Sequence, residues 1–359
     1  MIENSFVLPD EDGQTIESRG MAGTHHDRRL VIIRRIRLWI RIVAVICIIL
    51  IPSGFVLWTG WEIASPSRRP LMDYHREFLT HPSEHGIRIA AFTASDCTPC
   101  LVVSPELSGN LGERGLKIRA QLSKHGLAVP VAGKVTGTLV LVHGRKGRKE
   151  DYLPIAERLC AAGFRCVIPD LPAHGDHPAN IATYGVREAD LPARVLDEAA
   201  MKFGFEKQPV GLMGMSMGGS VAIHAANLPN APWKALVVIS SFDSFPKVIE
   251  GQATRYAGLT VGPIWAHGTD AVYQWKSGIP LSSIQPRLHA AHLRLPTLIA
   301  HGTADPVVDV SSGKRLYDSL PATSRKKWVE IPGADHDNVL ITDFPIYAEI
   351  AEWMIRNAR

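Results

Sequence analysis

Short, nearly continuous apolar runs recur from about residue 86 onward and are separated by longer amphipathic segments. A run that is apolar at almost every position is typical of a parallel β-strand buried on both faces. The runs with this character are residues 137–144, 164–170, 209–216, 234–241, 296–302 and 326–333. Amphipathic helices are predicted over residues 149–163, 186–204, 216–228 and 344–357. The alternation of strand and helix predicts an α/β fold with a mostly parallel, doubly wound sheet that has helices on both faces.

One apolar run near the N-terminus is much longer than the others. Residues 42–58 contain no charged side chain, and a run of this length lies at the lower limit for a membrane span. Trp39, Trp58 and Trp61 lie near its two ends, where indole rings favour the headgroup region. We therefore predict an N-terminal transmembrane helix over residues 36–61. The alternatives are a buried core helix, although nothing polar breaks the run, and a cleaved signal peptide, although no small-x-small motif follows.

The charge beside this run predicts its orientation. Residues 28–41 hold six arginines and no acidic residue, and positive charge is retained on the cytoplasmic side of a membrane. We expect a single-pass protein with residues 1–35 as a disordered cytoplasmic tail, residues 62–85 as a linker, and residues 86–359 as one extracytoplasmic domain. The net charge of +4 comes largely from the arginine block. The remainder is roughly neutral, so nothing in the charge indicates nucleic-acid binding.

Residues 214–218, Gly-Met-Ser-Met-Gly, match the pattern G-x-S-x-G. The pattern alone is common by chance, but here a predicted buried strand precedes it and a helix rich in small residues follows. This strand–turn–helix context is typical of a nucleophile elbow, so we predict that Ser216 is a nucleophile. Side chains at Gly214 and Gly218 would collide with the neighbouring strand and helix. The alternative is a glycine-rich turn whose serine has no role.

A serine hydroxyl becomes a good nucleophile only beside a base that is itself oriented by a carboxylate. With a nucleophile elbow the expected chain order is serine, acid, histidine. Asp305 follows the predicted strand 296–302, and His336 follows the last predicted strand. We predict Asp305 as the acid and His336 as the base. Asp309 and Asp335 are the alternative acids.

Acyl transfer also needs two backbone N–H donors for the developing oxyanion. One is predicted at Met217, directly after the serine. The other is predicted at Arg145, after the strand 137–144, where Gly144 permits a tight bend. His143 precedes the serine in the chain and is interpreted as a structural residue.

Further basic side chains follow the same bend, at Lys146, Arg148 and Lys149. Together with Arg145 they could favour an anionic substrate. The favoured interpretation is that most of them are solvated loop charges.

The motifs named so far resemble those of the α/β-hydrolase family. The resemblance lies in the segment from Leu141 to Asp176, LVHGRKGRKEDYLPIAERLCAAGFRCVIPDLPAHGD, and in GMSMGG, HGTADPVV and GADHDNV. It covers most of residues 86–359. The chain has a single HG and not HGGG, which disfavours the hormone-sensitive-lipase-like branch. The C-terminal motifs are similar to a subgroup that includes membrane-associated acyl-protein thioesterases, and the esterase, thioesterase and serine-aminopeptidase-like branch is favoured.

The resemblance implies a catalytic triad of Ser216, His336 and Asp305 with oxyanion donors at Arg145 and Met217. It implies cleavage of an ester or thioester in a small-molecule or lipid-like acyl substrate, with no organic cofactor and no metal. A serine peptidase or an acyltransferase would use the same residues. A non-catalytic binding protein with this fold is the alternative from another functional class. The oligomeric state stays open.

About fifty residues separate the predicted strand that ends at Ser241 from the one that starts near Leu295, more than a simple connection needs. Aromatic residues are frequent there: Phe242, Phe245, Tyr256, Trp265, Tyr273 and Trp275. We predict a small cap over about residues 242–294 that shapes an apolar acyl pocket. Helices that only cover the sheet are the alternative.

Four cysteines lie in or near predicted strands. Cys97 and Cys100 form a C-x-x-C motif, but too few residues separate this motif from the first predicted parallel strand for a thioredoxin-like domain. We predict a turn between two antiparallel strands, with a local disulfide compatible with an extracytoplasmic location. Cys160 and Cys166 are equally consistent with a disulfide and with buried thiols.

Overall fold

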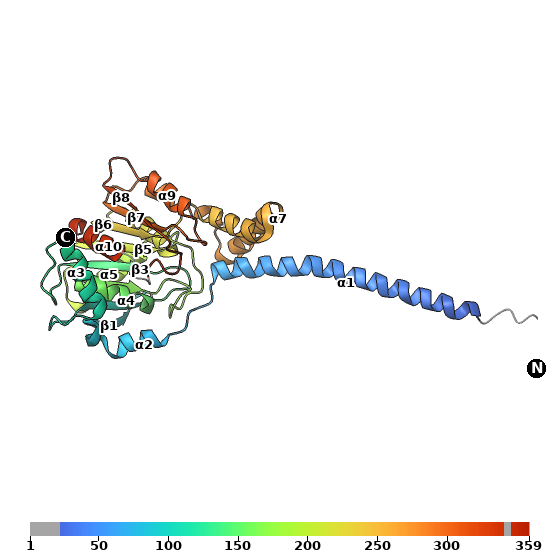
Figure 1. Cartoon of the computed structure of the whole chain (residues 1–359), viewed down its shortest axis with the longest axis horizontal. Helices are drawn as coiled ribbons and strands as arrows, with labels where there is room; N and C mark the ends of the chain where they lie inside the picture. Colours follow the sequence, from blue (N-terminus) through green and yellow to red (C-terminus); the bar gives the residue numbers. More distant parts are fainter. Residues whose placement is uncertain (1–21, 341–345, 359) are drawn as a thin grey trace, which may run out of the picture. The chain divides into compact units, whose positions relative to one another are not determined.

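The structure is a computed structural model that describes residues 22–340 and 346–358. By its internal contacts the chain divides into two units, Met1–Phe55 and Val56–Arg359. Helix α1, Ala22–Ala64 (Figure 1), makes up the described part of the first unit, and its last residues, from Val56 onward, belong to the second unit. The second unit contains all the other helices and strands of the described chain.

Helix α1 includes a segment, Arg29–Ala64, that is long and apolar enough to cross a membrane. Between residues 29 and 55 its described side chains are exposed, as expected of a helix that spans a bilayer and not of a core helix. The membrane helix predicted over 36–61 falls within this segment. The tail predicted over residues 1–35 lies partly outside the described residues, and its described part belongs to α1 instead of being irregular.

The second unit is built on one sheet. Within the described residues its strands are β1 (Ile87–Thr93), β2 (Pro99–Pro105), β3 (Gly137–Val142), β4 (Phe164–Pro169), β5 (Val210–Met215), β6 (Ala235–Ile239), β7 (Thr297–Gly302) and β8 (Lys326–Ile331). Their order is β1-β2-β4-β3-β5-β6-β7-β8. The strands from β4 to β8 pair in parallel, whereas β2 pairs antiparallel with both β1 and β4. Every strand predicted from an apolar run is present, and the mostly parallel sheet is confirmed.

Burial explains why the apolar runs became strands. Every residue of β3, β6 and β7 is buried. Alternate side chains of β3 enter two separate cores, with Val140 and Val142 in one and Leu139 and Leu141 in the other. The edge strand β8 has mostly half-buried side chains. The sheet is therefore covered on both faces, and its edge is only partly covered.

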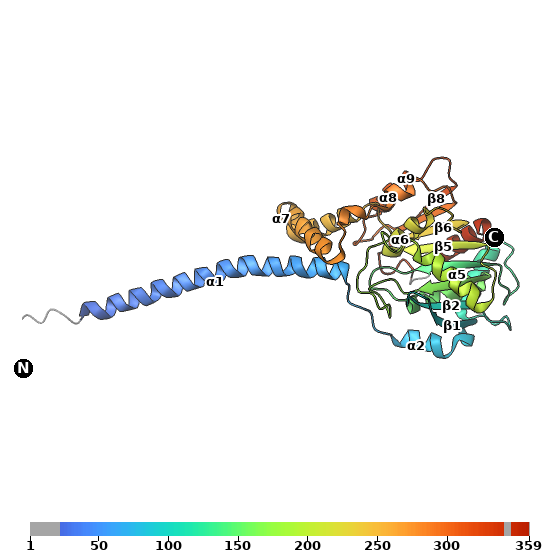
Figure 2. The same cartoon turned by 180° about the vertical axis from the view of Figure 1, so that it is seen from behind.

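Helices lie on both faces of the sheet. One core contains α3 (Glu113–Lys124), α4 (Leu153–Ala161) and α10 (Ile346–Asn357), and the other contains α5 (Leu191–Phe203), α6 (Met217–Ala226), α8 (Pro286–Ala290) and α9 (Val310–Ser319). Figure 2 shows the second set from behind. The remaining elements are α2 (Asp73–Thr80), α7 (Phe245–Ser277) and the 3-10 turns η1 (Pro82–His85), η2 (Lys149–Tyr152) and η3 (Leu281–Ser283). This covering by helices on both faces confirms the doubly wound arrangement.

Some predicted helices differ at their starts. The helix predicted over 149–163 begins as the 3-10 turn η2 and becomes α-helical only at Leu153. The helix predicted over 186–204 begins at Leu191, because Pro192 fits the first turn, where a backbone N–H is not needed. Of the last predicted helix, residues 344 and 345 lie outside the described residues.

The segment predicted as a linker, residues 62–85, is packed against the sheet domain. It contains the end of α1, then α2 and η1, and the side chains of His75 and Phe78 are buried. The Arg68 guanidinium donates to the carbonyls of Gly175 (3.1 Å) and Ala179 (3.0 Å). Polar composition suggested a tether, but these long-range contacts hold the segment in place.

The C-x-x-C motif lies where β1 turns into β2, which confirms the predicted turn between antiparallel strands. Cys97 is exposed with φ 67° in the turn, and Cys100 is buried on β2. Both thiols are free in the structure, as are those of Cys160 and Cys166. The local disulfide considered from the sequence is therefore not formed, and the second pair are buried thiols.

Candidate active site

Ser216 occupies a strained turn between β5 and α6. Its backbone has φ 54° and ψ −119°, a conformation that side chains rarely adopt and that marks functional sites. Its N–H donates to the carbonyl of Ile239 (2.8 Å), and its own carbonyl accepts from the Ser241 hydroxyl (2.8 Å). Strand β6 and the residues after it therefore hold the strained peptide on both sides.

The glycines beside Ser216 are required for steric reasons. A Cβ atom added at Gly214 would lie 2.1 Å from the carbonyl oxygen of Gly218, and one added at Gly218 would lie 2.2 Å from that of Val142. Gly144 differs, because its added Cβ would make ordinary contacts of 3.4 Å. The left-handed residue of that bend is Lys146, with φ 61°. Neither close packing nor a positive φ therefore requires glycine at position 144.

We expect Gly218→Ala to lower the Tm by roughly 10 °C, because the new methyl group meets backbone that cannot move away. Gly144→Ala is the matched control and should change the Tm by no more than about 3 °C. Thermal unfolding of both detergent-solubilised variants, followed by circular dichroism, checks this. Equal Tm values for the two variants would show that close packing at the elbow does not require glycine.

The structure brings Ser216, His336 and Asp305 together in one hydrogen-bonded series. His336 Nε2 lies 2.9 Å from Ser216 Oγ, and His336 Nδ1 lies 2.7 Å from Asp305 Oδ2. The three residues follow β5, β8 and β7, whose carboxyl ends meet at the same edge of the sheet, where parallel α/β sheets hold their sites. This arrangement can take a proton from the serine and stabilise the resulting imidazolium.

The environment of Asp305 keeps its carboxyl ionised. Burial acts against ionisation, but hydrogen bonds from His301 and His336 hold the pKa of Asp305 well below its ordinary value. Oδ1 also accepts from the N–H groups of Val307 (2.9 Å) and Val308 (2.8 Å). His301, which the sequence reasoning missed, is fully buried on β7. A carboxylate fixed in this way orients the His336 ring, so that Nδ1 carries a proton and Nε2 faces the serine.

The alternative residues are engaged elsewhere. The Asp309 carboxylate caps α9 by accepting from Ser311 N (2.8 Å). Asp335 Oδ1 accepts from Asn338 N (2.7 Å) in a tight turn. His143 has both ring nitrogens engaged, Nδ1 with the carbonyl of Gly144 and Nε2 with the N–H of Leu171. Burial also lowers the pKa of His143, so the residue is neutral, as its structural interpretation requires.

A cavity of about 450 Å³ opens beside Ser216 and His336. Arg145 and Met217, the predicted oxyanion donors, both line it. Its apolar lining includes Tyr184, Phe242, Phe245, Val248 and Leu340. Tyr184 comes from the loop between β4 and α5, for which the sequence carried no signal. Only the first turn of α7 contributes to the lining, so most of the predicted cap does not shape this cavity.

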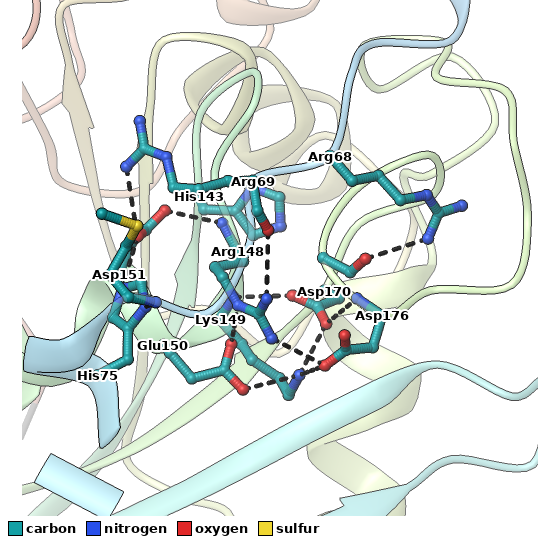
Figure 3. A network of polar contacts seen from close by, with 12 residues as sticks. Arg68, Arg69, His75, His143, Arg148, Lys149, Glu150, Asp151, Asp170 and Asp176 are labelled. Carbon is teal, nitrogen blue, oxygen red and sulfur yellow. Dashed lines mark hydrogen bonds and ion pairs between the residues drawn. The ribbon is translucent and has the colours of Figure 1, made fainter. Parts of the chain in front are cut away.

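Two of the basic residues interpreted as solvated loop charges, Arg148 and Lys149, are in fact buried, and Figure 3 shows the polar contacts that they make. Lys149 Nζ donates to Asp170 (2.9 Å) and Asp176 (2.6 Å), and Arg148 Nε donates to Glu150 (2.6 Å). A buried cation is tolerated when carboxylates pair with it and accept its hydrogen bonds. The loop after β4 supplies two of these carboxylates. This network therefore fixes the bend after β3 that carries Arg145.

A model of the family described as "Alpha/beta hydrolase family" matches residues 139–348. Among curated proteins, "Putative esterase YitV" of Bacillus subtilis is 25% identical over 215 residues, which are 55% of this chain and 82% of the relative.

Solved structures share the fold at lower identity. An esterase of Pyrococcus furiosus, Pf2001, has a TM-score of 0.58 at 16% identity and covers 83% of this chain and 99% of its own. An acylaminoacyl peptidase of Pyrococcus horikoshii has a TM-score of 0.53 at 15% identity, with 81% of this chain and 44% of its own covered. At these identities the structural matches establish similarity of fold alone.

Proposed function

Because this chain belongs to the alpha/beta hydrolase family, we propose that it is a serine hydrolase that cleaves carboxylic esters or thioesters through an acyl-enzyme. The family match confirms the resemblance found in the motifs and, with the structural matches, the α/β-hydrolase fold. Esterase-like relatives and neighbours support hydrolase activity in general. The serine nucleophile, the ester or thioester bond that is cleaved and the roles of individual residues are our proposal.

The observation that supports the proposal most directly is the 2.9 Å contact between His336 Nε2 and Ser216 Oγ. In the first half-reaction, His336 accepts the serine proton while Oγ bonds to the acyl carbonyl carbon. The proton then passes from His336 to the departing alcohol or thiol. In the second half-reaction, water loses a proton to His336 and attacks the acyl-enzyme, and Ser216 regains its proton as the acid leaves. Asp305 stabilises the imidazolium in both.

Two backbone N–H groups are proposed to bind the oxyanion. Met217 is the first residue of α6, and the first N–H groups of a helix have no partner within it. The positive end of the helix dipole also favours negative charge at this position. The second N–H is that of Arg145, which lines the same cavity. Neither group needs a metal or an organic cofactor for this reaction.

The lining of the cavity supports an apolar acyl group. The cavity that Ser216 lines is also lined by the apolar side chains of Phe242, Phe245 and Val248. Apolar surfaces of this kind bind acyl chains by excluding water. Small-molecule or lipid-like acyl compounds are therefore the proposed substrates.

A panel of p-nitrophenyl esters of increasing chain length, with thioester and aminoacyl substrates beside it, tests this function. We expect kcat/KM to rise with acyl length until the cavity is filled, and ester and thioester turnover to exceed aminoacyl turnover. Phe245→Ala should shift the preferred chain length, whereas Leu288→Ala, an exposed apolar residue on α8 that does not line the cavity, should not. Faster aminoacyl than ester cleavage would favour a peptidase instead.

We also propose that α1 anchors the protein in a membrane as a single span. The segment Arg29–Ala64 has the length and composition for it. The arginines of residues 28–41 favour a cytoplasmic N-terminus and an extracytoplasmic hydrolase domain.

A further inference from the structure

Helix α7 is kinked at Gly258 (φ 79°), and on both sides of the kink it exposes large apolar side chains, a set that we call the α7 apolar face. Its residues and their exposed fractions are Tyr256 (75%), Leu259 (85%), Val261 (53%), Ile264 (71%) and Trp275 (74%). Residues 256–268 include no Asp, Glu, Lys or Arg, whereas the outer side of a helix on a soluble protein is normally polar. An exposed apolar patch of this kind indicates an interaction with another apolar surface.

Within the second unit, α7 packs against the end of α1 (Figures 1 and 2). Trp265 Nε1 donates to Thr59 Oγ1 (3.1 Å), and the hydroxyls of Thr59 and Thr269 lie 3.0 Å apart. The two helices approach closely at glycines. A Cβ added at Gly60 would lie 2.5 Å from Val272 Cβ, and one added at Gly268 would lie 2.8 Å from Val56 Cγ1. The middle of α7 is therefore fixed beside residues 56–60.

This contact determines the depth of α7 relative to the proposed membrane. Val56 belongs to the uncharged run of residues 42–58, so in an anchored protein Gly268, which touches it, lies at the bilayer boundary. Ile264 lies one helical turn from Gly268. At that depth exposed apolar side chains are stabilised by burial among lipid chains.

The candidate active site lies close to the same boundary. The carbonyl of Ile63 accepts from the Tyr184 hydroxyl (3.0 Å), and the carbonyl of Glu62 accepts from Arg145 Nη2 (2.9 Å). Tyr184 and Arg145 both line the cavity beside Ser216. Residues 62 and 63 are only about one helical turn beyond Thr59. Lys276 Nζ lies 3.5 Å from the centre of the Trp61 ring, an aromatic and cationic pair suited to the headgroup region.

We propose that the α7 apolar face inserts into the surface of the bilayer that α1 anchors, and that the enzyme takes its acyl substrate from that bilayer. The substrate class is a membrane-resident acyl lipid, whose ester or thioester carbonyl reaches Ser216 from the interface. The inference rests on the proposed anchor and hydrolase function. Lipid covers this face more readily than a second protein chain does, because a second chain would itself have to lie at the bilayer boundary, level with Val56.

Spin labels on the full-length chain in phosphatidylcholine vesicles test the insertion. In a background with Cys47→Ser and Cys97→Ser, the exposed thiols, single labels are placed with Leu259→Cys, Ile264→Cys and, as the control, Leu107→Cys. Leu107 is 71% exposed and lies in the loop after β2. We expect labels at 259 and 264 to be accessible to oxygen and shielded from a nickel chelate, and the label at 107 to show the reverse. Labels at 259 and 264 that behave like the control, or that are shielded from both reagents as in a protein interface, would overturn the insertion.

An activity measurement tests the origin of the substrate. Leu259→Gln combined with Ile264→Gln should leave hydrolysis of p-nitrophenyl acetate within twofold and reduce hydrolysis of a long-chain lipid ester in vesicles by roughly tenfold. The matched control, Leu107→Gln with Met201→Gln, changes exposed apolar residues outside α7 and should affect neither substrate. An equal loss on both substrates would overturn delivery from the bilayer. A wild-type chain that cleaves neither ester would overturn the proposed function, whereas the spin-label depths would still decide the insertion.

Discussion

Ser216→Ala is expected to reduce kcat/KM for ester hydrolysis by roughly 10⁴–10⁶-fold, because removal of the nucleophile leaves only binding and oxyanion stabilisation. The Ser216 hydroxyl lies 2.9 Å from His336 Nε2. Without this hydroxyl no covalent acyl-enzyme can form. Kinetics with a p-nitrophenyl ester, together with labelling by a fluorophosphonate probe, measure the effect. The probe should label the wild-type chain and not the variant.

Ser240→Ala is the matched control for that result. Ser240 is also buried, follows a parallel strand and has a positive φ of 44°. Its Oγ has no hydrogen-bond partner among the described residues. We expect this variant to keep its activity and its labelling. Undiminished labelling of Ser216→Ala would contradict the proposed nucleophile, and loss of activity in both variants would point to a general effect on the fold.

Asp305→Asn is expected to reduce kcat by roughly 10³–10⁴-fold, an effect second only to loss of the serine. The carboxylate accepts from His336 Nδ1 at 2.7 Å. An amide offers an N–H donor toward the same nitrogen, favours the wrong histidine tautomer and removes the negative charge that stabilises the imidazolium. Rates measured under substrate saturation separate this effect from weaker binding.

Asp309→Asn serves as the control for the acid. Asp309 was an alternative from the sequence, but its carboxylate accepts from Ser311 N at the start of α9. Asparagine is also a good N-cap, so stability and activity should both change little. A larger kcat loss in Asp309→Asn than in Asp305→Asn would reverse the assignment of the acid.

Local patterns predicted much of this molecule because their physical causes are local. The apolar runs became strands since a strand buried on both faces needs apolar residues at nearly every position. The elbow could be predicted because its signal is local: a five-residue glycine and serine pattern between a strand and a helix, in which Gly214 closely approaches the backbone of Gly218. Asp305 and His336 followed from chain order and strand ends, and the structure brings both to Ser216.

Other features depend on contacts between distant parts of the chain. Lys149 is buried because Asp170 and Asp176, 21 and 27 residues later, pair with it, and a local pattern indicates neither partner. Residues 62–85 have the composition of a tether, but Arg68 binds carbonyls more than a hundred residues away. Tyr184 was missed for the same reason, because its place beside the cavity depends on contacts such as the one with the carbonyl of Ile63.

The sequence by itself determined the strands, the position of the serine turn and the long apolar helix, because each depends on a pattern of residues that are close together in the chain. Only the tertiary structure decided which charges are buried, which aromatic residues line the cavity and where α7 lies. Those outcomes depend on pairings such as Thr59 with Thr269, whose partners are far apart in the chain. The burial of these residues depends on which distant segment packs against them, and a local sequence pattern does not indicate that segment.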